Sequence, residues 1–129
     1  MIYKSKNIVL NSYIPTEIPT LEQLGHSQTV SELCNLQQGL VLVTGVTGAG
    51  KTTTIAAMNQ KILRERSVVA VTIEDPIEYV FDHACGLVKQ REIGEDTKSF
   101  SNALRSALRQ DPDVIVVSEL RDLETIRTA

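Results

Sequence analysis

The stretch Gly45-Val46-Thr47-Gly48-Ala49-Gly50-Lys51-Thr52 fits the spacing G-x-x-x-x-G-K-[ST] of a phosphate-binding loop, the P-loop. Glycines let backbone N–H groups curl around an anionic phosphate with no Cβ in the way. A helix after the loop would point its positive N-terminal end at the same phosphates. Lys51 adds a charge over the β and γ phosphates, and the Thr52 hydroxyl can ligate Mg²⁺. These eight residues and Thr53 therefore predict a nucleotide site.

The residues on either side of this loop have the order that such a site requires. Gly39 to Thr44 is a short apolar run with β-branched residues, which is typical of a buried parallel strand. Thr53 to Arg66 has apolar residues at helical spacing and cations near its carboxyl end. A glycine-rich turn that binds nothing is the alternative interpretation, but the order of strand, loop and helix favours the nucleotide site.

The rest of the chain continues the alternation of strands and helices. Strands are expected at 68–73 and 114–117, a helix from a cap at Thr97 or Ser99 to Arg109, and a further helix from Asp122. The chain has 129 residues, 42% of them hydrophobic and only 4% aromatic, which suits one domain with an aliphatic core. The pattern predicts an α/β fold whose mostly parallel sheet is flanked by helices.

Residues 1–38 look like a linker region with one strand, at Asn7–Ile14. The prolines that follow it, Pro15 and Pro19, favour an extended connector. Short helices are expected at 20–24, ended by Gly25, and at 30–33. Further along the chain, residues 79–90 are expected to form a short hairpin or an irregular segment.

Net charge and cysteine spacing indicate which partners and which cellular compartment to expect. The net charge of −3 offers no basic excess to neutralise a nucleic-acid backbone, so no nucleic-acid partner is expected. Cys34 and Cys85 form no C-x-x-C pair and no zinc spacing, which favours free thiols in a reducing compartment. Neither a signal-peptide core at the start nor a run of transmembrane length is present. A cytoplasmic location without direct membrane insertion is therefore expected.

Acidic residues follow two of the expected strands. In a parallel α/β sheet, ligands bind at the carboxyl ends of the strands, where nucleotide hydrolysis needs a carboxylate to hold Mg²⁺ and a group to handle water. Glu119 follows four apolar strand residues, in the position of a Walker B carboxylate. Glu74, Asp75 and Glu78 are candidates for the water-handling role, and the pattern alone does not choose among them.

Several ordered motifs together resemble the secretion ATPase superfamily, which includes type II secretion, type IV pilus and VirB11-like motors. They are Gly39 to Thr52, Thr72-Ile-Glu-Asp-Pro-Ile-Glu78, Ala107-Leu-Arg-Gln-Asp-Pro-Asp-Val114 and Glu119-Leu-Arg-Asp122. The stretches Ile18 to Gly25, Gln90 to Thr97 and Glu124 to Arg127 are most similar to the pilus retraction ATPases. The resemblance covers nearly the whole chain.

This resemblance implies a RecA-like P-loop NTPase core that works as a homo-hexamer and hydrolyses ATP with Mg²⁺ to pull pilin subunits from the fibre. The stretch Thr72–Glu78 matches the family's Asp box, so Glu78 would be catalytic, together with Lys51 and Glu119. Mg²⁺ would be held by Thr52 and Glu119, in part through water. The implied location is the cytoplasmic side of the inner membrane, reached through a pilus platform protein.

The sequence also departs from the family pattern. Ser118 stands where the family usually has glycine, and Gln38 stands where a basic residue is common. The family's His box and C-terminal helical region would lie beyond Ala129. We therefore expect residues 1–38 to be a remnant of an N-terminal PAS-like domain plus linker. Residues 39–129 would be the N-terminal part of a truncated RecA-like core.

Two other functions remain open at this point. One is a nucleotide-binding remnant that does not hydrolyse, and the other is a fragment of a type II secretion or VirB11-like assembly ATPase. A small P-loop kinase does not explain the Asp box. Because the segments named above are missing, little steady-state ATPase activity is expected from these 129 residues alone.

Overall fold

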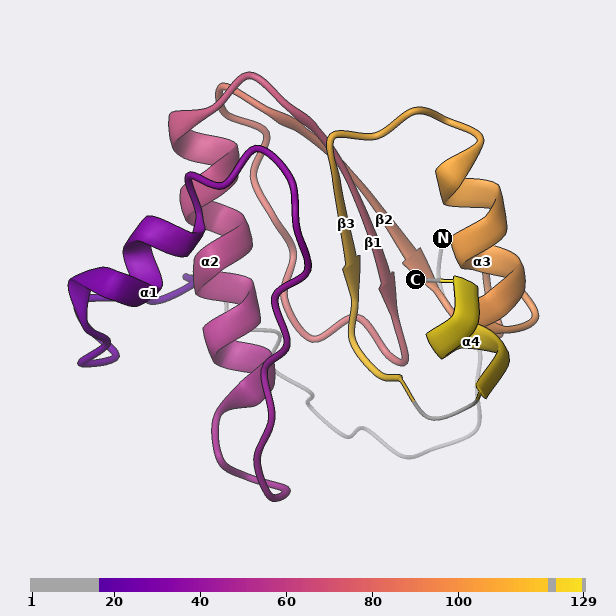
Figure 1. Ribbon diagram of the computed structural model, residues 1–129, viewed down its shortest axis with the longest axis horizontal. Helices are drawn as coiled ribbons and strands as arrows, with labels where there is room; N and C mark the ends of the chain where they lie inside the picture. Colours follow the sequence, from indigo (N-terminus) through magenta and orange to yellow (C-terminus); the bar gives the residue numbers. More distant parts are fainter. Residues whose placement is uncertain (1–16, 121–122, 129) are drawn as a thin grey trace, which may run out of the picture.

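A parallel sheet of three strands lies between two layers of helices (Figure 1). The computed structural model describes residues 17–120 and 123–128, so the strand predicted at 7–14 lies outside the described residues. The elements follow one another along the chain as α1 (Gln28–Leu33), α2 (Lys51–Glu65), β1 (Val69–Glu74), β2 (Leu87–Glu92), α3 (Phe100–Leu108), β3 (Val114–Val117) and α4 (Leu123–Thr128).

The central strand of the sheet is β1, with β2 on one side and β3 on the other. Thr72 of β1 is in register with Gln90 of β2 and with Val116 of β3. All three strands run in the same direction, and their arrowheads in Figure 1 point toward the end of the molecule that holds the loop before α2. The carboxyl ends of the strands and this loop therefore share one edge.

Successive residues of β1 are buried against opposite helix layers. Ala70 packs with Ala56 and Leu63 of α2. Val71 and Ile73 pack instead in a cluster with residues of α3, namely Ala103, Leu104 and Ala107. Burial on both faces explains why the strand is apolar almost throughout, as parallel strands covered by helices usually are. The predicted α/β fold is confirmed.

Helix α2 confirms the helix predicted at 53–66, although it begins two residues earlier and ends one earlier. The outer side of α2 is covered by residues that precede it, because Leu21 and Cys34 pack against Ala57 and Met58. Burial raises the pKa of the Cys34 thiol, and both cysteines are free thiols. The short helix predicted at 30–33 belongs to α1, whereas residues 21–25 form turns and not a helix.

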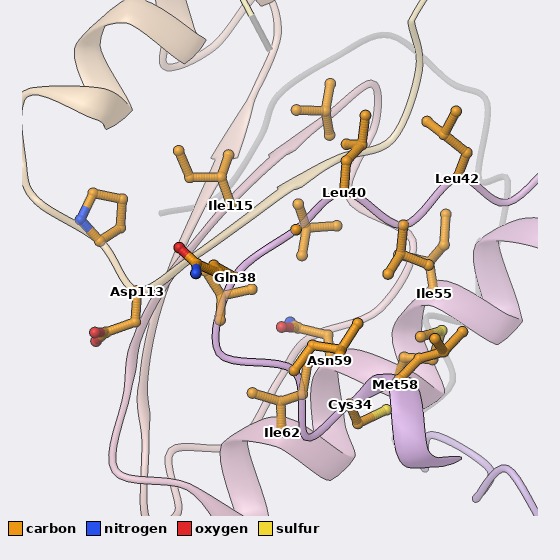
Figure 2. Close-up of a pocket in the computed structure, with 18 of the residues that line it drawn as sticks. Cys34, Gln38, Leu40, Leu42, Ile55, Met58, Asn59, Ile62, Asp113 and Ile115 are labelled. Atoms are coloured by element: carbon orange, nitrogen blue, oxygen red, sulfur yellow. The ribbon is translucent and has the colours of Figure 1, made fainter. Parts of the chain in front are cut away.

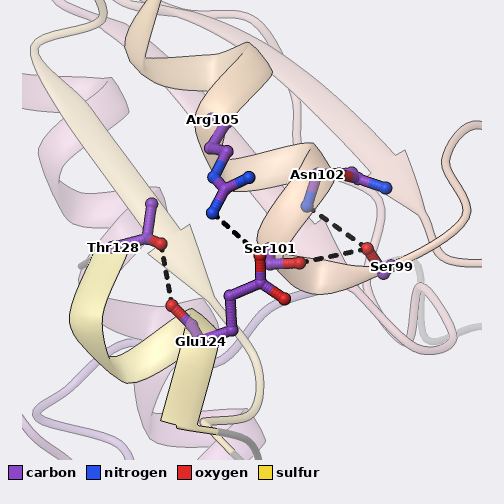
Figure 3. Close-up of polar contacts among 6 residues, drawn as sticks. All are labelled: Ser99, Ser101, Asn102, Arg105, Glu124 and Thr128. Carbon is purple, nitrogen blue, oxygen red and sulfur yellow. Dashed lines mark hydrogen bonds and ion pairs between the residues drawn. The ribbon is translucent and has the colours of Figure 1, made fainter.

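Helix α3 starts at the predicted cap, since the Ser99 hydroxyl accepts a hydrogen bond from the Asn102 N–H at 3.2 Å (Figure 3). Asp111, with a left-handed φ of 51°, turns the chain after this helix toward β3, which has the predicted bounds. An ion pair of 2.8 Å between Arg105 and Glu124 joins α3 to α4. The predicted helix after Asp122 is thus confirmed for Leu123–Thr128.

Strand β2 corrects the prediction for residues 79–90. A hairpin or irregular segment was expected there, but Leu87–Glu92 forms a parallel edge strand against β1. The sequence of β2 gives little indication of a strand, because Lys89, Gln90, Arg91 and Glu92 are all polar. The strand forms because β1 offers it a complete set of partners from Val69 to Glu74.

The strand predicted at Gly39–Thr44 is the second correction. This segment is not a strand, and Leu40 and Leu42 are 69% and 61% exposed. It lies across an apolar groove of about 410 Å³ from β3, with α2 as the floor (Figure 2). Among the described residues, the backbone of 40–44 has no hydrogen-bonding partner strand. An apolar run without such a partner cannot complete a ladder, and this explains the difference.

Candidate functional site

The loop Gly45–Gly50 has the backbone conformation of a cradle for an anion. Gly48 and Gly50 have φ values of 80° and 85°, a region that side-chain-bearing residues rarely adopt. Gly50 is the N-cap of the 15-residue helix α2, and no side chain caps that end. Within the described part of the chain, the N–H groups of Lys51, Thr52 and Thr53 donate to no protein acceptor, so they are available to an anion.

Lys51 closes the open side of this loop. Its Nζ donates hydrogen bonds of 2.9 Å to the carbonyl oxygens of Gly45 and Val46. The ammonium group is therefore held at the loop, and a phosphate oxygen could replace these carbonyl oxygens as the acceptor. A Cβ at Gly45 would lie 3.3 Å from the Cβ of Ala49, which shows how closely the loop folds on itself.

A hydrogen bond connects the first turn of α2 to the acidic segment after β1. The hydroxyl groups of Thr53 and Tyr79 lie 3.1 Å apart. The segment that holds Glu78 is therefore brought to the same edge of the sheet as the glycine loop. The structure thus brings together two groups of predicted site residues that are more than 20 positions apart in the sequence.

The acidic residues after β1 differ in their surroundings. Glu74 is 8% exposed, and its Oε1 accepts hydrogen bonds from Thr72 Oγ1 at 2.6 Å and from Gln90 Nε2 at 3.1 Å. Glu78 is exposed, and none of the described residues donates a hydrogen bond to its side chain. The Glu74 carboxylate is therefore occupied by hydrogen bonds within the sheet, whereas the carboxylate of Glu78 is accessible to water and to a ligand.

Glu119 lies at the same edge, two residues beyond β3. The pairing of β1 with β3 continues past the strand end, because the Ser118 N–H donates to the Ile73 carbonyl at 3.0 Å. Glu119 is therefore level with the start of the acidic segment on the neighbouring strand, and it is half-buried.

Nucleotide and Mg²⁺ suit the donors present. Open N–H groups and a lysine ammonium match phosphate oxygens, and the Thr52 hydroxyl and Glu119 carboxylate are hard oxygen ligands. No group of three or more His, Cys, Asp and Glu residues within 17–120 and 123–128 is placed to hold a metal.

Sequence reasoning missed three polar side chains that organise this edge: Tyr79, Gln90 and Glu92. A fourth is His26, whose Nε2 lies 3.0 Å from Thr54 Oγ1 in the first turn of α2. The sequence contains one indication that Gln90 and Glu92 act together, because residues two positions apart lie on the same face of a strand. Their partners depend on the register with β1, which sequence does not reveal.

The helix-covered parallel sheet, with a glycine loop and acidic residues at its carboxyl edge, defines an α/β protein with a RecA-like core. A family model described as type II/IV secretion system protein matches residues 8–129. The chain belongs to this family.

Solved and curated relatives agree with that assignment. The crystal structure of the pilus retraction motor PilT with bound ADP superposes with a TM-score of 0.87 at 60% identity, over 88% of this chain and 33% of that one. The type IV pilus retraction ATPase PilT of Pseudomonas aeruginosa is 52% identical over 116 residues, 90% of this chain and 34% of its own length. The type II secretion system protein E of Xanthomonas campestris pv. campestris is 49% identical over 92 residues, 70% of this chain and 15% of its own.

This chain therefore spans about a third of the length of PilT. In the part of the chain that the structure describes, no helix has the length and apolar character needed to cross a membrane.

Proposed function

We propose that this chain is the nucleotide-binding part of an ATPase that drives type IV pilus retraction. It binds ATP with Mg²⁺ in the P-loop formed by Gly45 to Thr53. The observation that carries the proposal is the linked geometry of the site: the open amino end of α2, with Lys51 folded over it, is tied through Thr53 and Tyr79 to the segment of Glu78. The similarity to PilT, whose crystal structure holds ADP, supports it.

Different residues of the chain bind the phosphates, hold the metal and accept the proton. The N–H groups at the start of α2 and the Lys51 ammonium bind and orient phosphate oxygens. Thr52 and Glu119 would hold Mg²⁺, Glu119 in part through water. Bound Mg²⁺ would supply neutralisation of the charge that develops on the phosphates. Glu78, exposed at the same edge, is the carboxylate that accepts a proton from the attacking water.

Assembly is the second part of the proposal. The family resemblance implies a homo-hexamer that meets an inner-membrane pilus platform protein on the cytoplasmic side. The arginines that could reach the phosphates of a neighbouring subunit are Arg91, Arg105, Arg109, Arg121 and Arg127, and the alternative for each is a solvated surface charge. We expect little steady-state turnover from these 129 residues alone, because a ring ATPase needs groups outside the chain that binds the nucleotide.

A function in type II secretion is the alternative. The relative from Xanthomonas is 49% identical, nearly as similar as the pilus protein, although over a shorter stretch. Over a comparable length the identities differ: the type II secretion system protein E of Aeromonas hydrophila is 42% identical over 114 residues, against 52% over 116 for PilT, and this favours the pilus.

Binding is tested by thermal unfolding of the chain with and without Mg-ATP. A ligand that binds only the native state at about 100 times its Kd stabilises it by about 2.7 kcal/mol. For a domain of this size that corresponds to a rise in Tm of about 10 °C. Lys51→Ala removes the charged phosphate contact and should weaken binding by about 10–100-fold, since a hydrogen bond to a charged group is worth roughly 1.5–3 kcal/mol.

Lys61→Ala is the matched control, because Lys61 lies in the same helix and its loss changes the charge equally. Its ammonium group pairs with Glu65, four residues along α2 and far from the P-loop. The nucleotide-induced shift should be unchanged in this variant. Absence of any shift in the wild-type chain at millimolar Mg-ATP would contradict the proposed site, and so would an equal loss in both lysine variants.

A further inference from the structure

The segment that carries Glu78 is held by side chains of the neighbouring strand. We propose that Gln90 and Glu92 of β2 are positioning residues that fix the backbone on both sides of Glu78 for hydrolysis. The inference rests on the proposed function, in which Glu78 handles the attacking water. Neither residue is part of the P-loop or of the Asp box.

Gln90 bonds to three separate points of the chain around this segment. Its Nε2 donates to the Tyr79 carbonyl at 2.8 Å and to Glu74 Oε1 at 3.1 Å. Its Oε1 accepts from the Phe81 N–H at 3.1 Å. Only one orientation of the amide satisfies a carbonyl, a carboxylate and an N–H together, so the network also fixes which way the amide points.

Glu92 holds the other side of Glu78. Its Oε2 accepts a hydrogen bond of 2.9 Å from the Ile77 N–H. Glu78 thus lies between Ile77, whose N–H is bound by Glu92, and Tyr79, whose carbonyl is bound by Gln90. Both neighbouring residues are therefore held by strand β2, while the Glu78 side chain stays exposed.

The register of the sheet explains why β2 supplies both groups. Thr72 pairs with Gln90, and Glu74 pairs with Glu92. These positions share the face of Val88, which packs against the cluster below α2. Alternation along a strand therefore sends Gln90 and Glu92 to the α2 side, where the acidic segment turns back toward the P-loop.

The hydrogen bond between Tyr79 and Thr53 connects the position of the Glu78 segment to the P-loop. The Tyr79 carbonyl is held by Gln90, and its hydroxyl lies 3.1 Å from Thr53 Oγ1 in the first turn of α2. A displaced Tyr79 would move Glu78 relative to the phosphates without removing any phosphate ligand. Misplacement of a catalytic group by about 1 Å can cost roughly 100-fold in rate. The expected signature is therefore a loss of rate with binding retained.

The kinetic test is a single-turnover measurement on the whole chain, with the chain in excess over radiolabelled Mg-ATP. This format detects hydrolysis far slower than steady-state assays do. Gln90→Met removes the hydrogen bonds and keeps the length of the side chain. The plateau rate should fall by about 10–100-fold, and the half-saturating chain concentration should stay within about threefold.

Glu92 offers a matched pair of variants. Glu92→Gln keeps an oxygen that accepts from the Ile77 N–H and should retain most of the rate, whereas Glu92→Leu should lose it. Lys89→Met is the control in the same strand, because Lys89 is exposed and contacts Gln110, away from the Glu78 segment. Its plateau rate should match that of the wild type.

Amide hydrogen exchange measured by NMR tests the contacts without any hydrolysis. The Phe81 amide should exchange faster in Gln90→Met, and the Ile77 amide should exchange faster in Glu92→Leu but not in Glu92→Gln. Unchanged exchange at these amides would overturn the inference, and so would a Gln90→Met plateau within twofold of wild type.

A different result would show that the proposed function, and not the positioning role alone, is wrong. If wild type hydrolyses no faster than Glu78→Gln, Glu78 is not catalytic and the positioning role falls with it. The Mg-ATP thermal shift then still reports whether the P-loop binds nucleotide.

Discussion

Gly86 sets how closely the chain before β2 approaches the end of α2. Its N–H donates a hydrogen bond of 2.8 Å to the Leu63 carbonyl. A Cβ at this position would lie 2.9 Å from the Val68 carbonyl oxygen and 3.1 Å from that of Arg66. Both are backbone atoms, which cannot move aside as a side chain can. A side chain at this position would therefore push β2 away from its place beside β1.

Gly86→Ala should destabilise the protein by about 1–3 kcal/mol, as insertion of a methyl group into a closely packed site does. Urea unfolding followed by circular dichroism measures the change. The control is Cys85→Ala at the preceding exposed residue, which should stay within about 0.5 kcal/mol of wild type. An equally small effect in Gly86→Ala would mean that the backbone there moves freely.

Glu74 and Glu78 show what a single residue's surroundings add to a sequence pattern. Both acids follow the same strand, and the pattern alone does not choose between them. In the structure, Glu74 is buried and accepts two hydrogen bonds, whereas Glu78 is exposed. The choice of Glu78 came from the family resemblance, and these surroundings support it as a proposal.

At the scale of elements, predictions succeeded where local sequence sufficed. β3 has four β-branched residues between two turn signals, and α3 has a serine cap followed by an apolar stripe. The predictions for β2 and for residues 39–44 were wrong for a common reason, because a strand forms only beside a neighbouring strand that it can pair with. A polar stretch became a strand beside β1, and an apolar stretch without a partner did not.

Helix α3 depends on its serine cap, because the Ser99 hydroxyl satisfies an N–H that the first turn otherwise leaves free. Ser99→Ala should cost about 1 kcal/mol, as the loss of an N-cap typically does. Thermal or urea unfolding measures this cost.

Ser99→Asn retains an acceptor oxygen and should recover most of the stability. Lys98→Ala, at the exposed neighbour, should change little. If Ser99→Asn were as unstable as Ser99→Ala, the hydroxyl would matter through its contact with Ser101, at 3.2 Å, and not through the cap.

At the scale of the whole molecule, the sequence predicted the layers of the fold and the glycine loop, because these follow from periodicity and spacing. The bonds between Gln90, Glu92 and the Glu78 segment could not be predicted, because they depend on which residues of β1 and β2 lie opposite each other. The groove beside β3 was also missed, since a paired strand was expected to fill it.

This groove leaves apolar surface open along the edge of β3. Leu40 and Leu42 line it from one side and Ile115 from the other, and Asn59 lies on its floor (Figure 2). Neither side-chain polar atom of Asn59 has a hydrogen-bond partner among the described residues, although the residue is buried. Exposed apolar patches and unpaired strand edges promote association. We expect the chain of 129 residues to self-associate through this groove.

Leu40→Lys combined with Leu42→Lys should reduce that association, because two charges on the groove wall resist burial against another chain. Stability should change by no more than about 1 kcal/mol, since both side chains are largely exposed. Sedimentation velocity measures the association, and binding of the dye ANS measures the open apolar surface. The matched control is Leu123→Lys with Val80→Lys, which adds the same charge at residues 71% and 57% exposed outside the groove. Equal reduction of association in both double variants would show that net charge, and not the groove, governs it.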